Sequence, residues 1–289
     1  MSRCELCPRK CGIDRSNNVG FCGVTNTIKI ARAGLHYWEE PVISGDKGSG
    51  TVFFSGCNLK CVYCQNYQIS SQAFGKEITP QRLAEIFKEL ENKGAHNINL
   101  VTPSHYVDGI IDALNIYRPN IPIVYNTNGY DSVETLKKLE GYVDVYLTDL
   151  KYFSSEISKK YSAAENYFSV ATQAILEMLR QQPTNVIKNN LLKKGVIIRH
   201  LVMPGCSGDS VKVLEWIKDN CPNACVSIMG QYTPCYKAEL YPEINKKITP
   251  LEYKRVISKF NALGLTNGYC QELDSASEEY IPPFNLEGV

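Results

Sequence analysis

The chain has 289 residues, 44% of them apolar, which is enough for one large α/β domain or two small ones. Lysine and arginine number 31 and aspartate and glutamate 30, so the charges balance. This balance favours neither DNA nor an anionic membrane as a partner. Twelve cysteines in a chain of this length, without an apolar leader, indicate a cytoplasmic protein with reduced, partly metal-bound thiols rather than a disulfide scaffold.

The first segment, residues 1–26, is rich in cysteine and poor in apolar residues. Cys4, Cys7 and Cys11 follow the spacing Cys-x2-Cys-x3-Cys, and Cys22 precedes a glycine further on. A segment with too few apolar residues to form a core needs a cross-link to hold its fold, so we predict a closed metal site of four thiolates. The tight spacing favours a second [4Fe-4S] cluster, whereas the Cys-Pro and Cys-Gly turns favour zinc. Both alternatives stay open, beside that of four free thiols.

Residues 27–50 connect this segment to the next motif. Weak alternation over 27–32 predicts an edge strand, and the glycines near residue 50 predict a loop that packs against the following strand. His36 and Trp38 lie between them, and we interpret both as packing residues rather than as members of a site.

A three-cysteine motif follows the apolar run 51–56, which predicts a buried strand ending in Ser-Gly. Cys57, Cys61 and Cys64 have the spacing Cys-x3-Cys-x2-Cys, with the aromatic Tyr63 before the last. A [4Fe-4S] cluster needs four ligands, so three cysteines leave one iron open to a ligand that is not protein. Structural zinc usually takes four ligands in paired units, so we predict the catalytic ligands of an open cluster, best suited to an anaerobic cell.

From residue 79 onward, strand and helix patterns alternate. The predicted strands are 97–102, 121–125, 143–151, 195–205 and 225–230. The predicted helices are 79–94, 105–118, one opened by a capping box of Asp131 and Glu134, 156–181, 210–220 and 249–262, with a polar linker around 183–194.

These six β-α units predict an α/β fold, a partial (β/α)6 TIM-like barrel over residues 27–272, behind the small N-terminal cysteine-rich segment. Its working face should lie at the C-terminal ends of the strands, where the three-cysteine loop also lies. We expect the tail, residues 273–289, to cross either the mouth or the bottom of the barrel.

The octapeptide 57–64 and the strand before it resemble the cluster motif of the radical S-adenosylmethionine (SAM) enzymes. The stretches Asn-Thr-Asn-Gly at 126–129, Asp-Leu-Lys at 149–151 and Arg-x-Leu-Val-Met-Pro-Gly at 199–205 are similar to those of the activating enzymes of glycyl-radical enzymes. The resemblance covers about residues 51 to 235. It implies a [4Fe-4S] cluster and SAM as cofactors, reductive release of a 5′-deoxyadenosyl radical, and an electron donor such as flavodoxin or ferredoxin.

The resemblance also implies which side chains hold SAM. Asn126 is expected to bond the ribose, Lys151 to pair with the SAM carboxylate, and Arg199 to face the site from the fifth strand. Thr102 and Ser104 stand where the family usually has Gly-Gly-Glu. The full set of expected cofactor-binding residues is Tyr63, Thr102, Ser104, Asn126, Lys151 and Arg199.

The main functional hypothesis is therefore an oxidoreductase of the activating-enzyme-like type, which abstracts hydrogen from a substrate such as a glycine of a partner protein. One alternative is an iron-sulfur electron carrier or cluster scaffold that does not use SAM. Another is radical SAM modification of a small molecule or RNA. The balanced charge disfavours a zinc-dependent nucleic-acid module built on the first 23 residues.

Overall fold

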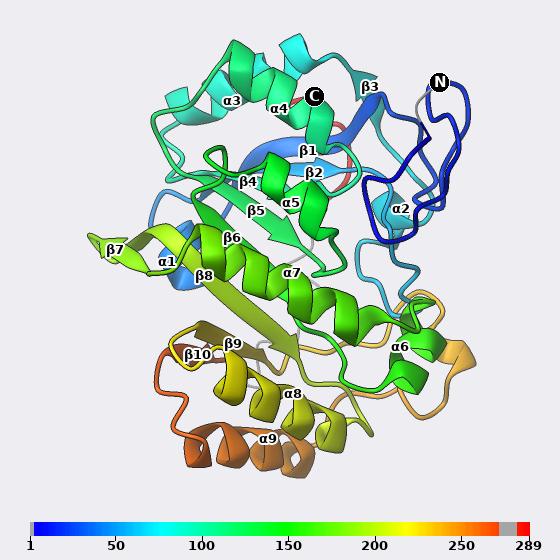
Figure 1. Ribbon diagram of the computed structural model, residues 1–289, viewed down its shortest axis with the longest axis vertical. Coiled ribbons are helices and arrows are strands. Elements are labelled where there is room, and N and C mark those ends of the chain that lie inside the picture. Colours follow the sequence, from blue (N-terminus) through cyan, green and yellow to red (C-terminus); the bar gives the residue numbers. More distant parts are fainter. Residues whose placement is uncertain (1–2, 272–281) are drawn as a thin grey trace.

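The computed structural model describes residues 3–271 and 282–289, which fold around one sheet of ten strands (Figure 1). The strands are β1 Ile28–His36, β2 Ser49–Phe54, β3 Lys76–Ile78, β4 Ile98–Val101, β5 Ile123–Thr127, β6 Val145–Asp149, β7 Val186–Lys188, β8 Leu191–Leu201, β9 Cys225–Met229 and β10 Gly268–Cys270. The helices are α1 Pro41–Ser44, α2 Tyr67–Ser70, α3 Pro80–Asn92, α4 Val107–Ile116, α5 Val133–Lys138, α6 Ser155–Ser162, α7 Tyr167–Gln181, α8 Ser207–Asn220 and α9 Pro250–Ala262.

The sheet order is β10-β9-β8-β6-β5-β4-β2-β1-β3, with β7 paired only to β8. The pairs from β2 through β4, β5, β6 and β8 to β9 are all parallel. The prediction of six parallel strands in an incomplete barrel is thereby confirmed. β10 adds one more parallel strand beyond β9, while β1 pairs with β2 in the antiparallel sense. Because β10 and β3 stand at opposite ends of this order, the described part of the barrel stays open.

The helices lie along the outer face of this sheet, where α3, α4, α5, α7, α8 and α9 follow one another in Figure 1. Every residue of β4, β5 and β6 is buried, as expected for strands covered on both faces. Thr79 caps α3, and a complete capping box of Thr249 and Glu252 opens α9. Both helices also begin with a proline, so the two predicted helix starts are confirmed.

Three local predictions are wrong. The helix expected over 156–181 is two helices, because Ala163 ends α6 in the left-handed conformation (φ 53°). The linker expected at 183–194 contains a hairpin, since Asn189 and Asn190 both take positive φ, as a tight hairpin turn requires. The cap of α5 is Ser132, whose hydroxyl accepts a bond from the Thr135 amide, and not Asp131.

The region before the three-cysteine loop also differs in detail. The strand expected over 27–32 is longer and does not lie at the edge, because β3 pairs with its outer side. The short helix α1 precedes the loop expected before residue 50, and that loop is present over residues 45–48. The expected packing of this region against the next strand is confirmed by the β1–β2 pairing.

The two end segments lie on the barrel without adding a domain core of their own. Residues 3–26 contain no helix or strand. Residues 282–289 run beside β1, where the Glu287 carbonyl accepts a bond from the Ala33 amide (2.8 Å) and the Glu287 carboxylate pairs with Arg32 (3.0 Å). The predicted tail residues 273–281 lie outside the described residues. In the part of the chain that the structure describes, no helix is long and apolar enough to cross a membrane.

Candidate active site

The three-cysteine loop leaves the C-terminal end of β2 through a tight turn. Gly56 has φ 86°, and a Cβ there would lie 2.8 Å from Val24 and 2.9 Å from the Cys22 carbonyl. Only glycine allows the N-terminal segment to approach the loop this closely. The next residue, Cys57, donates its amide hydrogen to the Cys22 carbonyl (3.1 Å).

Each of the three thiols is buried or half-buried beside polar groups that suit a metal-bound sulfur. The sulfur of Cys57 accepts hydrogen bonds from the Leu59 amide and from Asn128 Nδ2, both at 3.4 Å. Cys61 Sγ lies 3.0 Å from the Ser162 hydroxyl, and Cys64 Sγ lies 3.2 Å from the Ser70 hydroxyl. Such donors to sulfur tune an iron-sulfur cluster, and they orient the ligands.

Burial governs the pKa of these thiols in the metal-free chain. Burial, then the neighbouring Cys61 thiol, raises the pKa of Cys57 to about 12. Burial also raises the pKa of Cys61, although Lys151 and the Ser162 hydroxyl oppose it. A metal that binds here must displace these protons. Within residues 3–271 and 282–289, no three His, Cys, Asp or Glu side chains lie close enough together to hold a single metal ion.

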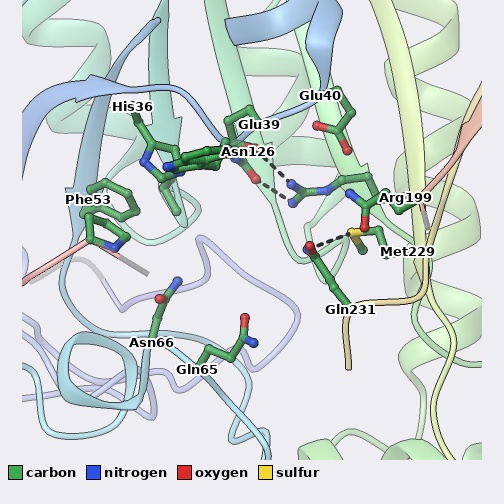
Figure 2. A pocket seen from close by; sticks show the side chains of 14 residues that line it. His36, Glu39, Glu40, Phe53, Gln65, Asn66, Asn126, Arg199, Met229 and Gln231 are labelled. Carbon is green, nitrogen blue, oxygen red and sulfur yellow. Dashed lines mark hydrogen bonds and ion pairs between the residues drawn. The ribbon is translucent and has the colours of Figure 1, made fainter. Parts of the chain in front are cut away.

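A buried network of charged side chains lies next to the loop. Asp149, the last residue of β6, pairs with Lys151 (2.5 Å) and with Arg199 Nε (2.9 Å). Arg199, on β8, also pairs with Glu39 (3.3 Å) and donates to Asn126 Oδ1 (2.7 Å), and Asn126 in turn donates to Glu39 (3.1 Å). Figure 2 shows Glu39, Asn126 and Arg199 gathered on one side of the pocket, with Gln65 and Asn66 on the other.

The two carboxylates of this network have opposite pKa shifts. Burial alone would raise the pKa of Asp149, but Arg199 and then Lys151 outweigh it, so the pKa lies below its ordinary value. For Glu39, burial prevails over the attraction of Arg199 and raises the pKa. Asp149 is therefore the anchored carboxylate, which holds both cations in place.

Two adjoining cavities open at this face of the barrel. One, of about 250 Å³, is lined by Cys61, Cys64 and Lys151. The other, of about 170 Å³, is lined by His36, Trp38, Glu39 and Asn126, among others. The residues common to both are Gln65, Asn66, Arg199, Met229 and Gln231. A ligand that reaches from the thiols across Arg199 would enter the second cavity.

The comparisons agree with this geometry. The model of the radical SAM superfamily matches residues 51–233, which is more than half of the chain. The chain belongs to the radical SAM superfamily. It is also 36% identical over 268 residues to Uncharacterized protein MJ0674 of Methanocaldococcus jannaschii, covering 88% of this chain and 73% of that protein.

Two further proteins are similar to part of this chain or share its fold. Pyruvate formate-lyase 1-activating enzyme of Escherichia coli is 25% identical over 170 residues, with 55% of this chain and 62% of the enzyme covered. The crystal structure of Streptococcus suis SuiB bound to precursor peptide SuiA aligns with a TM-score of 0.53 at 14% identity, covering 76% of this chain. The chain spans about half the length (48%) of that solved structure, and the likeness shows the fold alone.

Radical SAM membership implies a [4Fe-4S] cluster and SAM, and the residues present fit both. Cys57, Cys61 and Cys64 are three thiols of one loop with hydrogen-bond donors aimed at sulfur. Lys151 lies beside two of them in the same cavity, where an ammonium group can pair with a carboxylate. Arg199 supplies a second cation, already anchored by Asp149.

Four of the six expected cofactor-binding residues line the two cavities, and two do not. Tyr63, Lys151 and Arg199 line the cavity of the thiols, and Asn126 and Arg199 line its neighbour. The Tyr63 hydroxyl is bonded to that of Tyr152. Among the described residues lining these two cavities, neither Thr102 nor Ser104 occurs. The SAM contacts expected of those two residues stay predictions.

Sequence reasoning missed three residues of the site. Asp149 ends β6 two positions before Lys151, so the rule that strand ends carry function was a sufficient signal. Asn128 lies in the quoted Asn-Thr-Asn-Gly stretch, yet its bond to Cys57 needs the fold to be seen. Glu39 lies in an irregular stretch before α1, and no pattern in the sequence places it next to Arg199. His36 and Trp38, interpreted as packing residues, line the second cavity.

Proposed function

We propose that this chain is an activating-enzyme-like oxidoreductase that cleaves SAM reductively and directs the resulting radical to a glycine of a partner protein. The observation that carries the proposal is the pair of cations anchored by Asp149: Lys151 lines the cavity of the thiols, and Arg199 lines both that cavity and the second one. Radical SAM membership supports the SAM-dependent chemistry itself.

Each residue of the site has a role in this proposal. A [4Fe-4S] cluster held by Cys57, Cys61 and Cys64 would supply the electron that splits the sulfonium of SAM. Lys151 pairs with the SAM carboxylate, and the Asn126 amide bonds the ribose hydroxyls. Asp149 keeps the Lys151 ammonium from swinging away, because their 2.5 Å ion pair is buried.

The substrate is assigned to the second cavity. Glu39 and Gln231 present a carboxylate and an amide group there, which can bond the backbone of an extended peptide. The open side of the partial barrel allows a polypeptide loop to enter. The relation to pyruvate formate-lyase 1-activating enzyme favours a protein substrate, as does the peptide-bound state of SuiB.

The test is anaerobic reconstitution with iron and sulfide, reduction with dithionite, addition of SAM, and chromatography for 5′-deoxyadenosine. The wild-type protein should form the nucleoside, and Cys57→Ala should form none, because an open cluster needs all three thiolates. Cys270→Ala is the matched control, since Cys270 is exposed and distant in the sheet order from β2. A reduced cluster with no nucleoside, and no spectral change on adding SAM, would favour an electron carrier instead.

The substrate class has its own test. Protein extract from cells grown on glycine deuterated at Cα should transfer deuterium into 5′-deoxyadenosine, detected by mass spectrometry. Unlabelled nucleoside with that extract, together with stimulation by a protein-free metabolite fraction or by RNA, would reject the glycine and favour one of those substrates.

A further inference from the structure

The four N-terminal cysteines gather into one group, although residues 3–26 contain no helix or strand. Cys7 is buried and interacts electrostatically with Cys4, Cys11 and Cys22. Gly20 lies against two of these sulfurs, because a Cβ there would be 3.3 Å from Cys22 Sγ and 3.8 Å from Cys11 Sγ. The backbone therefore brings cysteines from both ends of the segment near one another.

Hydrogen-bond donors lie beside two sulfurs of this quartet, as they lie beside the sulfurs of the three-cysteine loop. The Phe21 amide donates to Cys11 Sγ (3.4 Å), and the Arg15 guanidinium lies 3.9 Å from Cys4 Sγ. Four thiolates carry a concentrated negative charge when they bind a metal group, and such donors stabilise it. Cys4 and Cys11 are half-buried, which leaves this group near solvent.

The quartet is attached directly to the loop that binds the catalytic cluster. The Cys57 amide donates to the Cys22 carbonyl (3.1 Å), so a ligand residue of one group is hydrogen-bonded to a ligand residue of the other. The Arg9 guanidinium bonds the Asn58 carbonyl (2.8 Å) one residue further along the loop. Residues joined by a backbone hydrogen bond have Cα atoms about 5 Å apart, so the two thiol groups are neighbours.

From this juxtaposition we infer that Cys4, Cys7, Cys11 and Cys22 hold a second [4Fe-4S] cluster that passes electrons to the cluster of Cys57, Cys61 and Cys64. Zinc is redox-inactive, so a zinc ion in the quartet could not use the contact between Cys22 and Cys57 for electron transfer. The inference rests on the proposed function, because it assigns the route by which the reducing electron arrives.

The electron balance is simple. A one-electron donor, such as a reduced flavodoxin or ferredoxin, is oxidised by one electron at the half-buried quartet. The quartet cluster is reduced by that electron and re-oxidised when the electron moves on. The catalytic cluster gains the electron that SAM cleavage consumes, and no bond forms or breaks during the transfer.

Metal analysis of the anaerobically reconstituted wild-type protein tests the site first. We expect about eight irons per chain and no bound zinc, because each cluster takes four irons. The double variant Cys4→Ser/Cys11→Ser, which alters half-buried ligands, should keep about half of this iron, whereas Cys270→Ser should keep all of it. About four irons with one zinc per chain, or about four irons with no second metal, would overturn the inference.

Electron paramagnetic resonance gives a readout independent of turnover. Two reduced clusters this close should broaden one another's signals, and the double variant should give a simpler spectrum of one cluster. That remaining signal should still shift when SAM is added. Two non-interacting signals would argue against a relay, while a remaining signal that ignores SAM would count against the proposed function and not against the second cluster.

The relay itself is tested by comparing two reductants. The double variant should lose at least tenfold in the ratio of flavodoxin-driven to dithionite-driven formation of 5′-deoxyadenosine, since a small reductant can reach the catalytic cluster without the relay. Cys270→Ser should keep the wild-type ratio. An unchanged ratio in the double variant would show that the quartet has no role in electron transfer and would contradict the proposed relay.

Discussion

The two cysteine groups are neighbours, yet the chain holds them by different means. Cys57, Cys61 and Cys64 follow a strand that is paired on both sides, and their loop returns to the sheet through α2 and β3. Residues 3–26 have no helix or strand, and side-chain hydrogen bonds hold them to the barrel together with the backbone bond between Cys57 and Cys22. Arg15 donates to the His105 carbonyl (2.8 Å), and Arg9 donates to the carbonyls of Asn58 and Ala163.

The two cysteine groups therefore differ in what holds their backbone in place, which is the sheet for one and, in part, a bound metal for the other. The sheet fixes the position of the catalytic loop before any cofactor arrives. The N-terminal segment depends on a few charge-assisted bonds and on whatever its thiols bind, because small segments without a core fold on their metal. The following variants measure each kind of support.

Arg199→Ala should have the largest effect on stability. It leaves Glu39 without its cation and Asp149 with Lys151 alone, and breaking a buried ion pair costs about 3–5 kcal/mol. Urea denaturation of the metal-free protein should show this loss in the free energy of unfolding. The iron of the N-terminal segment should be retained, because the damage lies within the barrel.

Lys138→Ala is the matched control for Arg199→Ala, since the Lys138–Asp108 ion pair is exposed on both sides. Exposed pairs contribute at most about 1 kcal/mol, so the control should be close to wild type. Equal effects of the two variants would mean that the buried network does not stabilise the mouth of the barrel.

Arg15→Ala should have a smaller and more local effect. Its guanidinium donates to the carbonyls of Thr25 (2.5 Å) and His105 (2.8 Å), and hydrogen bonds to charged groups contribute about 1.5–3 kcal/mol each. We expect a loss of about 3 kcal/mol, seen chiefly as faster proteolysis within residues 3–26. Arg15→Lys keeps the charge and should be intermediate; proteolysis at the wild-type rate in both variants would contradict this account.

His105 joins the two regions and should produce a modest pH dependence. Its Nε2 bonds the Ser55 carbonyl at the end of β2 (2.8 Å), and its buried Nδ1 has no hydrogen-bond partner among the described residues. Burial lowers the pKa of His105 to about 3, well below the ordinary 6.5. The unfolded chain therefore binds a proton first, and stability falls as the pH drops from 6.5 toward 3.

The expected loss from His105 is about 2 kcal/mol at pH 5 relative to pH 7. His105→Gln can still donate to Ser55 but does not titrate, so the stability of this variant should depend less on pH over that range. Chemical denaturation at several pH values measures the difference. A wild-type slope in the variant would assign the pH dependence to other histidines, such as the half-buried His36, whose pKa burial lowers to about 4.

The sequence was sufficient to predict the barrel strands and the catalytic loop. It was not sufficient to predict the helix break at Ala163, the hairpin at Asn189–Asn190 or the contact between Glu39 and Arg199. The apolar runs predict the six parallel strands. The spacing of Cys57, Cys61 and Cys64 predicts a cluster loop, because cysteines that only pack in a core need no such spacing. The breaks at Ala163 and at Asn189–Asn190 depend on single residues with positive φ, which periodicity does not register. Glu39 reaches Arg199 from far away in the sequence, and only the folded sheet brings them together.

Residues 282–289 have a consequence for how the protein is made. Pro282 lines the second cavity, and Phe284 packs against Phe53, another residue of its wall (5.5 Å between ring centres). The loop of Cys57, Cys61 and Cys64 leaves the ribosome long before these residues do. This wall of the second cavity is therefore synthesised after the loop, so the thiols are available to iron and sulfide before the second cavity is complete.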